Sequence, residues 1–328
     1  MNKLPWWAID SHVHCRDEEQ SHKATIASVI ELALSQGVGM IIDMPNPARP
    51  VTNRQRVYER LALVPKDQRE HYWLYVGLTG EEGQISEAVW CYNNIPEVVG
   101  FKMFAGKSVG DLSVTEMEDQ RMVYRWLTKL DYRGPVLDHC EKERWLYSKS
   151  WNAAKPRTHG QARPKVAEIE SVRDQIRLVT EEGFTGWLHI CHVSCPESVL
   201  LVHRAKMSRL KISCGVTPHH LMWDNTMMDR EDGLIYKMNP PLRGAEDVRE
   251  LQLRLRLGMI DVIETDHAPH TLEEKMGPPY LSGYPSLELY GKFVTEFLPG
   301  LGLSQDEVKA LTRDNILRIF GDKLKIAA

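Results

Sequence analysis

The segment IDSHVHCRD, residues 9–17, comes early in the chain and places His12 and His14 two residues apart. Successive side chains of a β-strand point to opposite faces, so residues i and i+2 share a face. If this segment is a strand, both imidazoles face one space, and Arg16 continues the series on the same face. Two convergent imidazoles suit a metal ion better than a packed core. The spacing alone leaves open a pair of ordinary polar residues at a strand end.

Around this segment, short apolar runs alternate with stretches of helical periodicity. The predicted strands are residues 8–13, 39–44, 72–78, 98–104, 135–139, 186–192, 211–216 and 261–265. The predicted helices are residues 22–35, 54–63, 84–92, 115–130, 165–182, 196–206 and 247–257. Eight strands that alternate with helices predict an α/β fold, a parallel sheet closed as a (β/α)8 TIM-like barrel. The alternative is an open doubly wound sheet, which usually carries a glycine-rich phosphate turn that this sequence does not show.

Composition narrows the classes of function. The 328 residues include 41 basic and 45 acidic side chains, a net charge of −4, which gives no reason to expect nucleic acid or an anionic membrane as a partner. Six scattered cysteines indicate reduced thiols rather than a disulfide framework. The sequence contains neither a signal-like N-terminus nor an apolar run of membrane-spanning length. We therefore expect a cytoplasmic protein with a single domain, residues 1–328.

Polar side chains lie in or directly after most of the predicted strands. In a barrel of this kind the carboxyl ends of the strands form one face, where active sites lie, so residues far apart in the sequence meet there. Each of these residues has an ordinary structural explanation, such as a capped turn or a hydrogen-bonded core histidine. Their repetition from strand to strand favours a functional site. The candidates are His12, His14, Arg16, Asn46, Lys102, His139, His192, Asp266 and His270.

Four imidazoles, one carboxylate and one lysine are suitable ligands for two zinc ions. An ammonium at Lys102 would repel the ions, but burial lowers a lysine pKa, and the neutral amine can react with carbon dioxide to give an anionic carbamate. The commoner role of a lone lysine is an ion pair with a carboxylate, here Asp138 or Glu141. The sequence leaves both roles open for Lys102.

Arg16 shares its face with the two imidazoles of the opening segment. A guanidinium can bind a carboxylate through two parallel hydrogen bonds, which suits a small anionic substrate beside the metals. Asn46 and His270 would add neutral hydrogen bonds. The alternative for Arg16 is a surface salt bridge with Asp17 or Glu18.

Several segments together resemble those of dihydroorotases in the amidohydrolase superfamily: DSHVHCRD, DMPNPARPV, GFKMF, HCE, HICHVS, TPHHL, NPPLR and TDHAPHTLEEK. The segments GFKMF and HAPHTLEEK are most similar to the dihydroorotase domain of the animal multifunctional pyrimidine-synthesis protein. The resemblance runs from about residue 9 to residue 320. It implies the reversible, zinc-dependent cyclisation of N-carbamoyl-L-aspartate to L-dihydroorotate in pyrimidine biosynthesis. Many relatives carry a small accessory β-sandwich domain, which we expect to be absent or vestigial here.

The resemblance also implies a role for each motif residue. The metal ligands would be His12, His14, Lys102, His139, His192 and Asp266. The substrate would be bound by Arg16, Asn46, Asn239, His270, Gly283 and Tyr284. Asp266 would also act as the catalytic acid and base, and carboxylated Lys102 would bridge two zinc ions.

Two other functions remain open on the sequence. A related cyclic amidase, acting on dihydropyrimidines, hydantoins or allantoin, would share the barrel and the metals but would not need a carboxylate-binding arginine, so Arg16 favours dihydroorotate. An inactive barrel could instead serve as a partner of aspartate transcarbamoylase. Inactive relatives usually lose metal ligands, whereas all six positions are filled here. The expected partner is a small-molecule substrate, with a homodimer and an association with aspartate transcarbamoylase as further possibilities.

Overall fold

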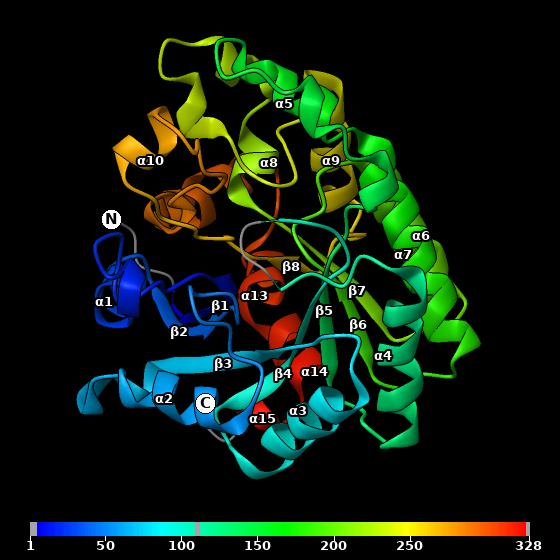
Figure 1. The fold of residues 1–328 in the computed structure, drawn as a ribbon. Coiled ribbons are helices and arrows are strands. Elements are labelled where there is room, and N and C mark those ends of the chain that lie inside the picture. The colour runs from blue at the N-terminus through cyan, green and yellow to red at the C-terminus, as the bar shows by residue number, and fades with distance from the viewer. Residues whose placement is uncertain (1–4, 109–111, 326–328) are drawn as a thin grey trace.

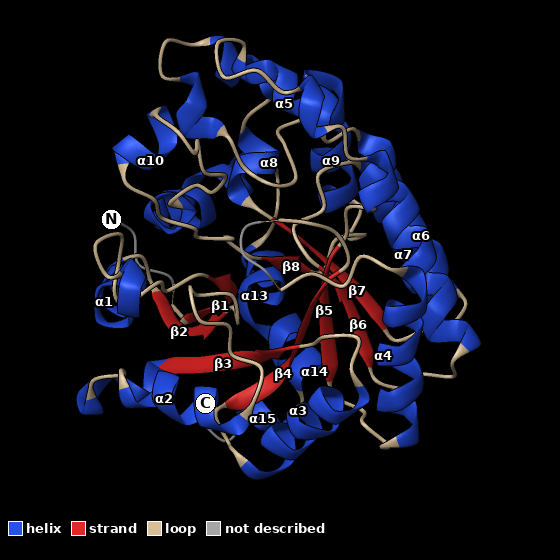
Figure 2. Ribbon diagram, in the orientation of Figure 1, coloured by secondary structure: helices blue, strands red, loops and turns tan. Residues whose placement is uncertain are grey.

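The computed structural model describes residues 5–108 and 112–325, and it confirms the predicted (β/α)8 barrel. Eight parallel strands pair in chain order, and helices surround them (Figures 1 and 2). A parallel bridge between Val13 and His267 joins the segment after the last strand to the first strand, with the His14 backbone N–H donating to the His267 carbonyl at 2.8 Å. The strands are β1 (Ala8–Val13), β2 (Val38–Asp43), β3 (Tyr72–Gly77), β4 (Val98–Phe104), β5 (Pro135–His139), β6 (Trp187–Ile190), β7 (Ile212–Val216) and β8 (Val262–Ile263).

The longer helices follow the predicted alternation. They are α1 (Ile26–Ser35), α2 (Arg54–Ala62), α3 (Glu82–Asn94), α4 (Met117–Lys129), α6 (Lys165–Glu181), α7 (Pro196–Met207) and α9 (Ala245–Arg256). Shorter helices lie in the connections and near the C-terminus: α5 (His159–Ala162), α8 (Pro218–Met222), α10 (Leu272–Met276), α11 (Tyr290–Lys292), α12 (Leu298–Gly300), α13 (Gln305–Lys309), α14 (Asn315–Phe320) and α15 (Asp322–Lys325). Among the described residues, no helix combines the length and apolarity that a membrane crossing requires.

Some predicted boundaries are wrong for local reasons. The helix predicted at residues 22–35 begins at Ile26, because the Thr25 side chain accepts a hydrogen bond from the Ser28 backbone and caps the helix there. The strands predicted at 186–192 and 261–265 are shorter, as β6 and β8. His192 and Asp266, just beyond these strands, have φ angles of 36° and 48°, in the left-handed region that ends regular strand geometry.

Apolar packing closes one end of the barrel and leaves the other to polar side chains. One core cluster lies between the strands and the surrounding helices. A second cluster lies inside the barrel, where Ile9 and Ile42 of the strands pack with Ile316, Ile319 and Phe320 of α14. The C-terminal helices occupy this end in Figure 1. The carboxyl ends of the strands lie at the opposite end, where the candidate polar residues meet.

Candidate active site

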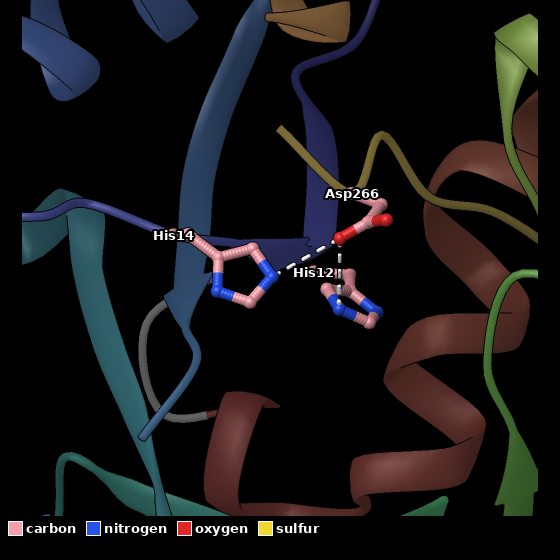
Figure 3. Close-up of side chains that lie close together, drawn as sticks. All are labelled: His12, His14 and Asp266. Carbon is pink, nitrogen blue, oxygen red and sulfur yellow. Dashed lines mark hydrogen bonds and ion pairs between the residues drawn. The ribbon is translucent and has the colours of Figure 1, made fainter. Parts of the chain in front are cut away.

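The first half of the site combines residues from the first strand of the barrel and from the segment after the last strand. His12 and His14 belong to β1 and its end, and Asp266 lies in the segment that follows β8. Asp266 Oδ1 lies 3.0 Å from His14 Nε2 and 3.3 Å from His12 Nε2 (Figure 3). One ligand atom from each residue lies within 4.8 Å of the others, so the group is suitable for binding a metal ion.

Burial and neighbouring charges give His12 and Asp266 the protonation states that metal binding requires. Burial lowers the pKa of His12 to about 4, so its imidazole is neutral at pH 7, as metal binding requires. Burial raises the pKa of Asp266, but His12 and His14 lower it by more, and the net pKa lies well below its usual range. Asp266 is therefore an ionised carboxylate at neutral pH.

Three site residues adopt an uncommon backbone conformation. Arg16, His192 and Asp266 have φ angles of 56°, 36° and 48°, a region that costs free energy for residues other than glycine. Such conformations persist where the surrounding structure requires them, and they are frequent at functional sites. Each of the three side chains lines the same cavity.

The second half of the site comes from β5 and β6. His139 ends β5, and its Nδ1 lies 3.1 Å from Nε2 of His192. The opposite nitrogen of His139 lies 3.0 Å from Glu141 Oε2, and Arg163 donates to the same carboxylate. Burial lowers the pKa of both imidazoles, so both are neutral and can accept a metal. The Glu141 contact directs Nδ1 of His139 toward His192.

Lys102 lies in β4 and is fully buried. Its Nζ donates to Cys191 Sγ at 3.0 Å, and it lies 5.1 Å from the centroid of the Phe104 ring. The carboxylates considered as its partners have other contacts: Asp138 accepts from the Tyr124 hydroxyl at 2.6 Å, and Glu141 pairs with His139 and Arg163. A thiol is a weak acceptor for an ammonium in such an environment.

The cavity at this end of the barrel contains most of the residues singled out in the sequence. Of the predicted site residues, its lining includes His12, His14, Arg16, Asn46, His139, His192, Asn239, Asp266 and Gly283. Sequence reasoning missed four lining residues, Phe104, Ser108, Ala268 and Ser282. Phe104 is the last residue of β4 and Ala268 lies two residues after Asp266, and these positions could have indicated these two. Lys102, His270 and Tyr284 lie outside this lining.

Two predicted substrate residues instead support their neighbours. His270 Nε2 lies 3.1 Å from a terminal nitrogen of Arg16, and the Arg16 Nε–H donates to the Pro269 carbonyl at 3.1 Å. The Tyr284 carbonyl accepts from the Ala268 N–H at 2.9 Å, and the Tyr284 ring packs against Tyr236. These contacts support Arg16 and Ala268, two residues of the cavity lining.

Asn46 has a supporting contact within the cavity. Its Oδ1 lies 2.9 Å from His14 Nδ1, so the imidazole donates there and keeps Nε2 for Asp266. Burial lowers the pKa of Arg16 to about 10, which leaves its guanidinium charged at neutral pH.

The long segment 147–164, for which the sequence suggested no role, supports the site from one side. His159 Nε2 lies 3.1 Å from Asn239 Oδ1 and 2.9 Å from the Met238 carbonyl. Arg163, near the end of the same segment, donates a hydrogen bond to the Glu141 carboxylate. Across the cavity, Asn239 Nδ2 donates to Ser108 Oγ at 3.4 Å. Ser108 lies in the loop that follows β4, and residues 109–111 of this loop lie outside the described part of the chain.

Comparisons with known proteins agree with this geometry. No family model matches the chain. The chain is 33% identical over 274 residues to a dihydroorotase of Latilactobacillus sakei, covering 81% of the chain and 60% of that protein. It is 29% identical over 321 residues to a dihydroorotase of Methanosphaera stadtmanae, covering 95% of the chain and 70% of that protein. The chain thus spans 60% to 70% of the length of these two relatives.

Solved structures share the fold. The L-hydantoinase (dihydropyrimidinase) of Arthrobacter aurescens superposes with a TM-score of 0.82 at 24% identity, covering 96% of this chain and 70% of that one. The dihydropyrimidinase of Brevibacillus agri gives a TM-score of 0.81 at 18% identity, with the same coverage of 96% and 70%. At these identities the likeness establishes the barrel alone. The two sequence relatives are dihydroorotases, and the solved structures share the barrel of this chain.

Proposed function

We propose that this chain is a metal-dependent dihydroorotase, which interconverts N-carbamoyl-L-aspartate and L-dihydroorotate. The observation that carries the proposal is Arg16, which is 3% exposed and lines the cavity beside Asp266. Its hydrogen bonds to the Pro269 carbonyl and His270 are with uncharged groups. A buried guanidinium that opens into a cavity favours an anionic ligand, and the carboxylate of dihydroorotate supplies one. A neutral dihydropyrimidine or hydantoin ring would leave this charge unpaired.

We propose two zinc ions in the site. His12, His14 and Asp266 would bind the first ion, and His139 and His192 the second. Lys102, as a carbamate, would bridge the two, which its burial and its weak thiol acceptor support. Two divalent ions bring four positive charges into a poorly hydrated space, where a carbamate is favoured and an ammonium is strongly unfavourable. When bound, the ions would polarise the amide carbonyl of the substrate and lower the pKa of water.

The protein's own residues would bind the substrate and move the proton. Arg16 would pair with the substrate carboxylate, while Asn239 and Gly283 would contact the ring. Asp266, ionised because of its low pKa, would accept a proton from the attacking water and deliver it to the departing ring nitrogen. Asn46 would keep His14 oriented toward Asp266, and His270 would hold Arg16 in position.

The test is a substrate panel on the purified protein, together with elemental analysis. We expect turnover of dihydroorotate and N-carbamoyl-L-aspartate to exceed that of dihydrouracil, hydantoin and allantoin, with about two zinc ions per chain. Faster turnover of an uncharged ring would assign the chain to the dihydropyrimidinases or hydantoinases. A zinc-loaded protein that turns over none of these compounds would indicate an inactive barrel.

We also propose that the protein works in the cytoplasm as one barrel unit and forms a homodimer. Its six cysteines are all buried free thiols, which agrees with a reducing compartment. Light scattering would test the dimer, and the same measurement with added aspartate transcarbamoylase would test that association.

A further inference from the structure

A second cluster of buried polar groups contacts His12 on the side away from Asp266. The centre of the cluster is Glu264, which is fully buried just after β8. Its Oε2 lies 3.5 Å from His12 Nδ1 and 3.4 Å from His189 Nε2. Its Oε1 accepts from the backbone N–H of His192. The imidazole of His12 is therefore held between two carboxylates, Asp266 at Nε2 and Glu264 at Nδ1.

We infer that Glu264 is a positioning residue that fixes the orientation and tautomer of His12 for metal binding. The inference rests on the proposed function, because it takes His12 as a zinc ligand. A metal-binding histidine usually donates its other ring N–H to a carboxylate or carbonyl, which fixes the ring and makes it a better ligand. Glu264 is the acceptor on that side of His12.

The unsatisfied atoms of the cluster face one another. Within the described residues, Nδ1 of His12, Nε2 of His189 and Oε2 of Glu264 are buried and have no regular hydrogen-bond partner. Their separations of 3.4 Å and 3.5 Å are ion-pair distances, slightly longer than a usual hydrogen bond. A buried polar group without a partner costs about 1–3 kcal/mol, so donation from both imidazoles to Glu264 is the arrangement that satisfies all three.

A chain of donors fixes the proton on His189. The indole N–H of Trp187 can only donate, and it lies 2.8 Å from Ser213 Oγ. The Ser213 hydroxyl then has its own proton to donate to His189 Nδ1, also at 2.8 Å. When Nδ1 accepts this hydrogen bond, the His189 proton lies on Nε2, which faces Glu264. The second donor is therefore oriented from the adjacent strands β6 and β7.

Gly215 of β7 provides the space for this carboxylate. A Cβ atom built on Gly215 would lie 2.3 Å from Glu264 Oε1 and 2.5 Å from its Cδ. Any side chain at residue 215 would therefore enter the volume that the Glu264 carboxylate occupies. An aspartate at 215 would bring a carboxylate into this volume from β7 instead of β8.

His12, Cys191 and Glu264 could also form a separate metal site. Against that alternative, Cys191 Sγ already accepts a hydrogen bond from Lys102 Nζ at 3.0 Å.

The experiment measures zinc affinity by chelator competition and the absorption spectrum of the Co²⁺-substituted protein. We expect Glu264→Gln to weaken binding of the first zinc ion, the one at His12, by about 10- to 100-fold, the usual effect of losing an outer partner of a ligand, and to change the Co²⁺ spectrum. The control is Asp261→Asn, which removes another buried carboxylate from the same segment, one that accepts from Cys214 and Lys206 near the other end of β8. This control should bind zinc as the wild type does.

Moving the carboxylate from residue 264 to residue 215 tests whether its place beside His12, rather than the residue that carries it, supports zinc binding. The double variant Glu264→Ala with Gly215→Asp should bind zinc more tightly than Glu264→Ala alone. If Glu264→Gln fails to fold, Glu264→Asp decides, because it keeps the charge and withdraws the carboxylate from both imidazoles, and it should also weaken zinc. Wild-type zinc affinity and Co²⁺ spectrum in a folded Glu264 variant would overturn the inference. A wild-type chain that binds no zinc would overturn the proposed function itself.

Discussion

The two halves of the candidate site are built differently. In the first half, Asp266 contacts both His12 and His14 directly, and Glu264 and Asn46 contact the far nitrogens of these rings. In the second half, His139 and His192 lie against each other, and Glu141 contacts only the far side of His139. The first half thus contains its own facing carboxylate, whereas the second half would depend, in the proposed site, on the carbamate of Lys102. The difference indicates that the two metal positions respond to different changes.

The largest expected effect is that of Asp266→Asn, which removes the carboxylate of the first half. It should lower kcat by about 10³-fold, because the proposed acid and base is lost together with a charged ligand. Steady-state assays with dihydroorotate and elemental analysis check both effects. Loss of zinc from the second half alone would contradict the asymmetry between the two halves.

Lys102→Ala tests the second half. We expect zinc to fall from about two ions per chain to about one, and activity to fall by about 10²-fold or more, because a bridging anion is lost. A short-chain carboxylic acid added in bicarbonate-free buffer should restore part of the zinc and the activity. A structure of the zinc-loaded wild type with a bare ammonium at Lys102 would refute the carbamate.

Arg16→Ala separates substrate binding from metal binding. It should lower kcat/KM for dihydroorotate by about 10²-fold, since losing a charge-assisted contact costs about 3 kcal/mol. Zinc content should stay at the wild-type level, because the guanidinium of Arg16 hydrogen-bonds to Pro269 and His270 rather than to the proposed ligands. Unchanged kinetics would show that the carboxylate-binding role is wrong.

The smallest effect concerns His159, whose segment supports the second half. Burial lowers its pKa to about 3, so the folded protein disfavours the proton that the unfolded chain takes up below about 6.5. Stability should therefore fall as the pH drops from about 6.5 toward 3, and His159 should account for about 2 kcal/mol of the loss by pH 5. Urea unfolding at pH 7 and pH 5 should show a smaller difference for His159→Gln. An equal difference in both proteins would exclude this origin.

Strand bounds and side-chain directions that depend on the local sequence pattern were predicted from the sequence. The predicted bounds of β1, β4 and β5 agree with the structure, because these strands are apolar runs with clear ends. The HxH spacing on β1 correctly predicted that His12 and His14 would lie in one cavity, because strand alternation alone determines that direction.

What the sequence could not predict depends on contacts between distant segments. Glu264 meets His189 across strands, in a space left by Gly215, and this arrangement depends on the register of β6, β7 and β8. His159 reaches Asn239 from a long connection with no regular pattern. His270 follows the Asp266 motif closely, yet it lies behind Arg16 because the chain turns after β8.

The distances along the chain between the site residues imply an order of assembly during synthesis. His14 and Asp266 are 252 residues apart, whereas His139 and His192 are 53 apart. At about 5–20 residues per second, a ribosome needs about 13–50 s between the first pair and only about 3–11 s between the second. A nascent chain therefore carries both second-half imidazoles long before the carboxylate of the first half emerges. In the proposed site, zinc binding at the first half, and with it the joining of β1 to the segment after β8, must wait until Asp266 has been translated.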